Sequence, residues 1–185
     1  MIKLSDWMFK IFNGWLVLLA IVVFILFMIF VLPDQAQKAD EYAKGNGSPD
    51  TSFFYTPERL FELAEVYGEE GRQAYVRARF TFDLVFPLAY VFFLASTISW
   101  LLKNSLAAEN PWRRLNLAPI IGGLFDLLEN TSTSLVMAGY PERRLWAAQI
   151  APVLTLLKWV FVYGSFVILF VFLGVWIFKK FKRGS

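Results

Sequence analysis

Four long runs of apolar residues, separated by polar segments, dominate the hydrophobicity pattern of this 185-residue chain. The first run carries no charge from Gly14 to Leu32, which is close to the roughly 20 residues with which a helix crosses a bilayer. A signal peptide has a shorter apolar core, so we interpret this run as an uncleaved span. The pattern predicts an all-α membrane protein, a four-transmembrane-helix bundle formed as one domain over residues 1–185. The expected spans are residues 12–32, 80–102, 115–138 and 148–178.

Prolines mark several positions along these runs. Pro33 directly follows the first run, and we expect it to end the first helix because proline lacks a backbone N–H. Pro87 lies about one turn after Asp83 in the second span and predicts a kink there. In the fourth span, Pro152 and Lys158 are expected to interrupt the helix and its apolar surface.

The polar residues 33–79 form the predicted first extracytoplasmic loop. Turn residues gather between Lys44 and Asp50, whereas Thr56-Pro57 has the pattern of an N-cap followed by proline at the first helical position. From there to Gly68, apolar residues recur at helical spacing and acidic residues fall towards the opposite face. Gly68 can end such a helix. We therefore predict a short amphipathic helix that lies on the bundle or in the headgroup plane. Its shielded residues would be Leu60, Phe61, Ala64 and Tyr67, and its wetter ones Glu58, Glu62 and Glu65.

Composition restricts the chemistry further. The chain is 57% hydrophobic and 18% charged, and it contains no cysteine and no histidine. Disulfides, thiolate chemistry, iron–sulfur clusters, typical zinc sites and His-ligated haem are therefore excluded. We expect no cofactor and no metal centre, with a hard cation on oxygen ligands left open. The net charge of +3 resides in the basic tail from Lys179 to Arg183, so we expect no nucleic-acid partner.

The distribution of basic residues predicts the orientation in the membrane. With the N-terminus inside, the N-terminal lead, the second connecting loop and the tail hold nine basic residues. The outer side holds six in the first loop, where nine acids outnumber them, and two in the third loop. Because short cytoplasmic loops carry an excess of Lys and Arg, this bias favours cytoplasmic positions for both termini.

The third span contains an unusual polar stretch from Gly122 to Ser132. Asp126, Glu129 and Asn130 are three and four residues apart, so they line one face of a helix. From the helical rise, Glu129 lies about 12–14 Å below the outer end of its span, level with Lys158 of the fourth span. We therefore predict that Lys158 and Glu129 pair directly or through one water. The two glycines that open the stretch allow another helix to approach closely.

Three interpretations of these intramembrane polar residues compete. In the first, Glu129 and Lys158 form a structural pair, and Asn130, Thr131 and Ser134 bond across helices. In the second, an outward-opening pocket binds a polar headgroup, with two residues at its mouth. The residues of this pocket would be Asp83, Asp126, Glu129, Asn130 and Lys158, with Arg79 and Tyr75 at the mouth. In the third, carboxylates and a lysine in low dielectric serve catalysis or proton movement.

Three short motifs carry a resemblance to known proteins. They are Gly68-x-x-Gly71-Arg72-x-x-Tyr75, Asp83-x-x-Phe86-Pro87-Leu88-x-Tyr90 and Asp126-x-x-Glu129-Asn130. Over about residues 55–159 the chain resembles a family of uncharacterised four-span bacterial integral membrane proteins, which implies a bacterial plasma (inner) membrane location. Its plan is also similar to that of the sterol-isomerase and sigma-2-receptor superfamily, whose members bind sterol-like amphiphiles in a membrane pocket. The isomerase site includes a histidine, which this chain does not have.

Three function hypotheses follow. The leading one is a non-enzymatic integral membrane protein with an outward-opening intramembrane polar pocket for a lipid-like amphiphile, so that membrane lipid is its expected partner. The alternative is an accessory subunit that packs against protein partners in a larger membrane complex. The third is a small lipid-modifying membrane enzyme. A receptor or an enzyme needs a cavity among the spans, whereas a packing subunit can have a filled core.

The predicted orientation can be tested with single cysteines in this cysteine-free chain. Introduced at Ser48 and Ser185, they should react differently with an impermeant thiol reagent in intact cells, because position 48 is expected outside and position 185 inside. We expect labelling at position 48 and none at position 185. Labelling at position 185 alone would reverse the orientation.

Overall fold

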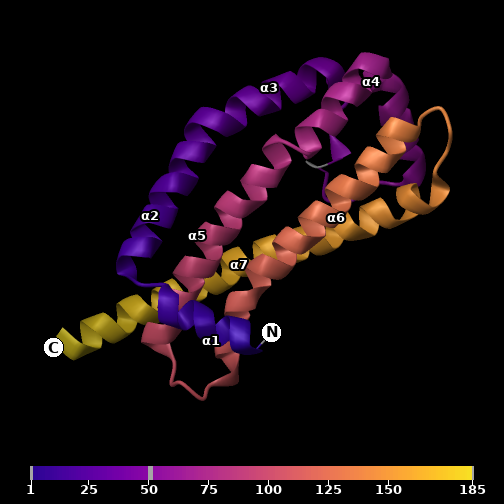
Figure 1. Ribbon diagram of the computed structural model, residues 1–185. Helices are drawn as coiled ribbons and strands as arrows, with labels where there is room; N and C mark the ends of the chain where they lie inside the picture. The colour runs from indigo at the N-terminus through magenta and orange to yellow at the C-terminus, as the bar shows by residue number, and fades with distance from the viewer. Residues whose placement is uncertain (1, 50–51, 185) are drawn as a thin grey trace.

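The computed structural model describes residues 2–49 and 52–184, and every regular element in these ranges is a helix. Asp50 of the predicted turn cluster and Ser185 of the tail lie outside the described residues. Figure 1 shows the arrangement of the elements. The α-helices are α1 (Ile2–Ile11), α2 (Gly14–Leu26), α3 (Leu32–Ala43), α4 (Pro57–Arg79), α5 (Phe82–Ser105), α6 (Ala118–Gly139) and α7 (Leu145–Gly184). Between them lie the π-helical segment η1 (Phe27–Val31) and the 3₁₀ helix η3 (Pro111–Leu117).

Three helical stretches within the described residues are long and apolar enough to cross a membrane. They are Gly14–Ala43, Pro57–Ser105 and Leu145–Lys182. The predicted all-α membrane protein is confirmed at this level. α6 is not among the three, because its acidic, amide and hydroxyl side chains between Asp126 and Ser134 lower its mean hydropathy.

The prediction that Pro33 ends the first helix is wrong. α3 continues to Ala43, with Pro33 in its first turn, where a proline needs no intrahelical donor. The preceding turn widens into η1, in which the N–H of Leu32 bonds to the carbonyl of Phe27, five residues back. This wider turn accommodates the proline ring without interrupting the helical stretch, so residues 34–43 are helix rather than loop.

The amphipathic helix predicted after Thr56 is confirmed. Thr56 Oγ1 accepts a hydrogen bond from the N–H of Arg59 at 3.2 Å, the apolar face is buried and the glutamates are exposed. Gly68, with a left-handed φ of 63°, bends the helix, but helix resumes beyond it to Arg79. Arg72 Nη1 donates a hydrogen bond to the carbonyl of Ala64 at 3.0 Å, so this carbonyl has a side-chain donor at the bend.

The expected interruption of the fourth span is also wrong. α7 runs through Pro152 and Lys158 as one helix of 40 residues. Pro152 removes one backbone hydrogen bond, but Ala147, Ala148 and Ala151 around it are buried against the bundle and hold the backbone in place. α5 also runs through Pro87 as one helix, which leaves the kink expected there a prediction.

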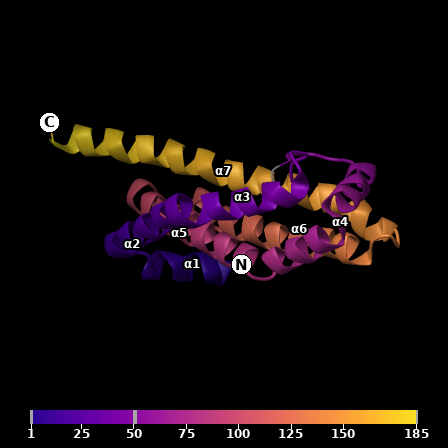
Figure 2. The ribbon, with the colours of Figure 1, turned by 90° about the horizontal axis from the view of Figure 1, so that it is seen from above.

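α6 lies at the centre of the fold and contacts α4, α5 and α7. α2 and η1 run beside α5, where Phe24 stacks on Phe93 with ring centroids 4.7 Å apart and Phe27 stacks on Phe86 at 5.6 Å. Figure 2 shows that α7 diverges from the other helices towards the C-terminus. α3 and α4 cover the end of the bundle at which α6 ends and α7 begins, which we call the outer end.

The opposite, or inner, end is formed by an element that the sequence pattern did not predict. The N-terminal lead forms α1, which packs on α5 and η3. Ser5 Oγ donates to Asn116 Oδ1 at 2.7 Å, and Lys103 Nζ donates to the carbonyl of Phe9 at 3.1 Å. Lys179 Nζ donates to the carbonyl of Ser105 at 2.7 Å, so the end of α7 lies there too. At the outer end Ser48 is only 9% exposed, which makes the exposed Asn46 the better cysteine-labelling position.

The close helix approach expected at the paired glycines is confirmed. A Cβ on Gly122 would lie 3.3 Å from side-chain carbons of Phe161 and Val162 in α7. A Cβ on Gly123 would lie 2.7 Å from Cγ2 of Val91 in α5, shorter than a normal contact. These glycines let α6 pack tightly on two helices at once.

Gly123→Ala should therefore lower the free energy of unfolding in detergent by about 1–3 kcal/mol, because the new methyl group overpacks the interface with Val91. Thermal unfolding followed by circular dichroism measures the change. Gly164→Ala is the matched control, since a Cβ there meets nothing within 4 Å and should be neutral or stabilising by up to about 1 kcal/mol. Adding Val91→Ala should restore part of the loss. Equal stability of the two alanine variants would contradict a tight α5–α6 contact.

Candidate functional site

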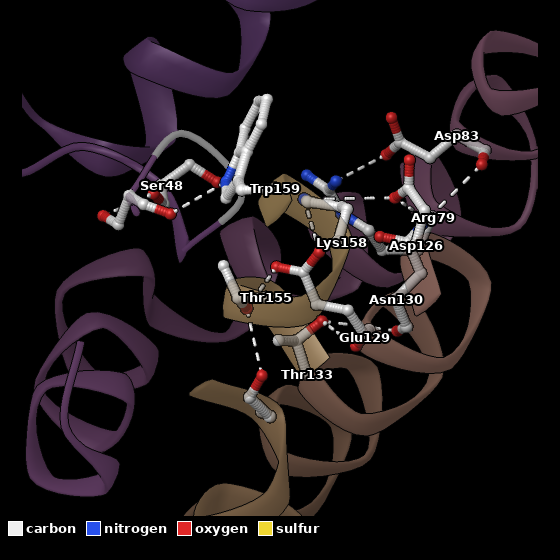
Figure 3. Close-up of polar contacts among 12 residues, drawn as sticks. Ser48, Arg79, Asp83, Asp126, Glu129, Asn130, Thr133, Thr155, Lys158 and Trp159 are labelled. Atoms are coloured by element: carbon white, nitrogen blue, oxygen red, sulfur yellow. Dashed lines mark hydrogen bonds and ion pairs between the residues drawn. The ribbon is translucent and has the colours of Figure 1, made fainter. Parts of the chain in front are cut away.

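The polar face of α6 points into the bundle, towards side chains of α4, α5 and α7 (Figure 3). Glu129 is 0% exposed, Asn130 2% and Lys158 of α7 5%. Charged groups cost several kcal/mol to place in hydrocarbon unless they have partners. The local contacts therefore decide how these residues can be held at this depth.

Lys158 and Glu129 form a direct ion pair, which confirms the predicted pairing. Lys158 Nζ also lies 4.0 Å from Asp126 Oδ1, so one ammonium group serves two carboxylates of α6. Glu129 Oε1 is 2.7 Å from Thr155 Oγ1, which is in turn 3.1 Å from the hydroxyl of Tyr55. Thr155 Oγ1 also lies 3.0 Å from the carbonyl of Ala151, so its single proton has three oxygen acceptors within reach.

A second ion pair lies nearer the outer end. Arg79 Nη1 is 2.7 Å from Asp83 Oδ2, both side chains are largely buried, and the guanidinium stacks over the ring of Tyr75 at 4.3 Å. Asn130 Nδ2 donates to the backbone carbonyl of Asp83 at 3.4 Å. That carbonyl is the one that Pro87, four residues on, cannot bond. α6 thus supplies the donor that the proline removes from α5.

All seven residues predicted for the site lie in this one region. Asn130 Nδ2 also contacts Asp126 Oδ1 at 3.5 Å and connects the two ion pairs. The hydroxyl groups that complete the cluster were not among the residues predicted from the sequence. Tyr90 donates to Asp126 Oδ2 at 2.9 Å, and Thr155 contacts Glu129. Helical spacing was the available signal, because Tyr90 is seven residues after Asp83 and Thr155 three before Lys158.

We call these residues the charge cluster: Tyr55, Tyr75, Arg79, Asp83, Tyr90, Asp126, Glu129, Asn130, Thr155 and Lys158. It contains three carboxylates and two cations, so acids are in formal excess. The hydroxyls of Tyr90 and Thr155 lie against two of these carboxylates and spread the excess negative charge through hydrogen bonds. Within residues 2–49 and 52–184, no group of three or more metal-ligating side chains is suited to hold a metal ion.

The expected cross-helix bonds of the α6 hydroxyls are only partly confirmed. Asn130 bonds across to α5, as expected. Thr131 instead donates to the carbonyl of Leu127 in its own helix at 2.8 Å, and Ser134 Oγ has no hydrogen-bond partner. Ser132 makes the contact to α7, donating to the carbonyl of Ala147 at 2.8 Å. The difference is one of helical phase, since Thr131 lies on the exposed side of α6.

A cleft of about 640 Å³ lies outside the charge cluster, at the outer end between α4 and the end of α6. Its wall combines charged, amide and apolar groups. The lining residues are Glu69, Arg72, Gln73, Val76, Arg77, Met137, Ala138, Tyr140 and Pro141. Arg72 stacks over the Tyr140 ring at 4.8 Å, whereas Arg77 is exposed. Of the motif residues named from sequence, Arg72 is the one that reaches this cleft.

Comparison of the chain with protein-family models, curated proteins and solved structures gives no match. The resemblance to four-span bacterial membrane proteins therefore stays a prediction, and function has to be argued from the site itself.

Removing one partner of the Lys158–Glu129 pair should strongly destabilise the protein, because the other charge is left buried. Lys158→Met and Glu129→Gln should each lower the melting temperature in detergent more than the double variant does; breaking such a pair typically costs about 3–5 kcal/mol. Lys158→Met should be the more severe single change, since after Glu129→Gln the ammonium group still has Asp126 at 4.0 Å.

Lys38→Met is the control for loss of a lysine. Lys38 pairs with Asp34 at 2.8 Å, but both side chains are about 60% exposed, so the change should cost at most about 0.5 kcal/mol. Lys158 and Glu129 variants that melt like the parent protein would show that the pair does not stabilise the fold.

Proposed function

We propose that the protein is a four-span integral protein of a bacterial plasma membrane, in which α6 is a span in addition to the three long apolar helices and both termini are cytoplasmic. Three observations support α6 as a span. Its polar groups are bonded within the bundle, its outward side carries the exposed Leu124 and Leu128, and its 22 residues are long enough to cross. Exposed tryptophans support the boundaries, with Trp15 and Trp112 at the inner end and Trp146 at the outer end.

Its proposed activity is binding of a lipid-like amphiphile at the outer end. The observation that carries this proposal is the 640 Å³ cleft between α4 and α6. Arg72 and Arg77 suit an anionic or polar headgroup, whereas Val76, Met137 and Pro141 suit the apolar part of the same molecule. We therefore propose a binding site beside the charge cluster, in place of the pocket within the cluster that the sequence suggested.

The charge cluster has a supporting role in this proposal. Its acids and bases are bonded to one another, and Lys158 and Glu129 are almost fully buried. A lipid-modifying enzyme would need these groups to reach a substrate, so the third hypothesis has less support than binding. The well-filled centre favours one further candidate, an accessory subunit that packs against protein partners in a larger membrane complex.

A variant that fills the cleft tests the proposal. Ala138→Trp places a large side chain in the cleft wall and should remove a co-purifying amphiphile that the parent protein holds at about one per chain. Lipid mass spectrometry of protein extracted in a mild detergent measures the stoichiometry. Leu128→Trp is the matched control on the exposed apolar side of the same helix and should retain the amphiphile.

Absence of a stoichiometric amphiphile from the parent, or its retention in Ala138→Trp at parental stability, would contradict binding in the cleft. Reproducible protein partners without an amphiphile would favour the subunit instead.

A further inference from the structure

The inner end of the molecule is strongly basic. α1, the end of α5, η3 and the end of α7 meet there. Their described basic side chains are Lys3, Lys10, Lys103, Arg113, Arg114, Lys179, Lys180 and Lys182. Only Asp6 and Glu109 in these elements and their connection are acidic. We call these eight side chains the basic rim.

No cation of the basic rim makes an ion pair with an acid of the described residues. Lys103 and Lys179 donate to backbone carbonyls, and Arg113 stacks over the Phe9 ring at 4.0 Å. Arg113 Nε is buried without a hydrogen-bond partner. The carbonyls of Phe9 in α1 and Ser105 at the end of α5 offer only part of a negative charge, so the positive charge of the rim is largely uncompensated.

The outer end differs. Lys38 pairs with Asp34, Arg59 with Glu62 at 3.0 Å and Arg79 with Asp83, so three of the basic side chains there have acidic partners, and residues 33–79 hold nine acids against six bases. The contrast indicates that the inner cations face a partner that supplies the negative charge.

Apolar side chains surround the basic rim on the side of the spans. Trp15 is 81% exposed and Trp112 63%, and Leu4 and Trp7 of α1 are exposed as well. Tryptophan of this kind lies at the headgroup level of a bilayer. The rim is therefore at the depth of lipid phosphates, where a soluble nucleic acid would meet the exposed apolar groups unfavourably.

We propose that the basic rim binds the phosphate headgroups of anionic phospholipids in the leaflet that surrounds the inner end. Lys103, Arg113 and Lys179, whose side chains are held in place by carbonyls and a ring, form the ordered part of this surface. The exposed Lys10, Arg114 and Lys182 add long-range attraction. This surface is at the other end of the bundle from the proposed cleft, and the inference does not depend on the cleft.

The test uses the full-length protein in nanodiscs made with equal amounts of phosphatidylglycerol and phosphatidylcholine. After mild detergent extraction, native mass spectrometry gives the ratio of the two lipids that stay bound. The parent protein should prefer phosphatidylglycerol, and high salt should weaken that preference because the attraction is electrostatic. Combined Lys10→Gln, Arg114→Gln and Lys182→Gln substitutions should reduce the preference at least about fivefold, since one such charge is worth about that factor.

Those three side chains are exposed and form no hydrogen bond or ion pair with the described residues, so the triple variant should fold, which gel filtration and helicity would confirm. Combined Lys38→Gln, Lys44→Gln and Arg59→Gln removes three outer charges and is the matched control, which should keep the preference. A parent protein without the preference, or a control that loses as much as the inner triple variant, overturns the proposal. The proposal is also overturned if, at matched ionic strength, inorganic phosphate displaces phosphatidylglycerol more than chloride does. The surface would then bind free anions rather than lipid. Ala138→Trp should leave the lipid ratio unchanged, which separates this result from failure of the cleft.

Discussion

The need to neutralise charge in a low-dielectric interior determines how this bundle is built. Lys158 can be buried because Glu129 and Asp126 lie on the facing side of α6, and those acids can be buried because Lys158, Tyr90 and Thr155 contact them. The requirement fixes the rotation of α6 relative to α5 and α7. The glycine pair at its start then brings the three backbones close enough for these contacts.

The outer helices belong to the same arrangement. The chain turns back over the bundle after α3, and the bend at Gly68 lets the two parts of α4 follow different directions. As a result Tyr55 reaches Thr155 from a segment outside the apolar spans, whereas the Arg79–Asp83 pair joins residues four apart where α4 meets α5. The cleft forms where the second part of α4 leaves the end of α6. A change in the charge cluster is therefore expected to alter the cleft wall through α4 and α6.

The two ends of the molecule have opposite electrostatic character. Acids and bases are mixed at the outer end, whereas the inner end presents cations held by carbonyls and aromatic rings. Such asymmetry suits a protein whose two ends meet different leaflets, because cytoplasmic leaflets carry anionic lipid. Amphiphile binding outside and phosphate binding inside would use these two surfaces separately.

The sequence alone determined the helical class, three helices long and apolar enough to cross a membrane, and the Lys158–Glu129 pair, because hydrophobic period and helical rise are local properties. It also indicated the N-cap at Thr56 and the close approach at Gly123. Only the tertiary structure decided whether helix-breaking residues end a helix. Pro33, Gly68 and Pro152 all lie within long helices. A widened turn compensates for Pro33, a side-chain donor for Gly68, and the packing of neighbouring residues for Pro152. The tertiary structure likewise brought Tyr90 to Asp126 and Asn130 to the carbonyl freed by Pro87. These contacts join segments that are distant along the chain. They depend on how each helix is rotated about its axis, which no local sequence pattern specifies.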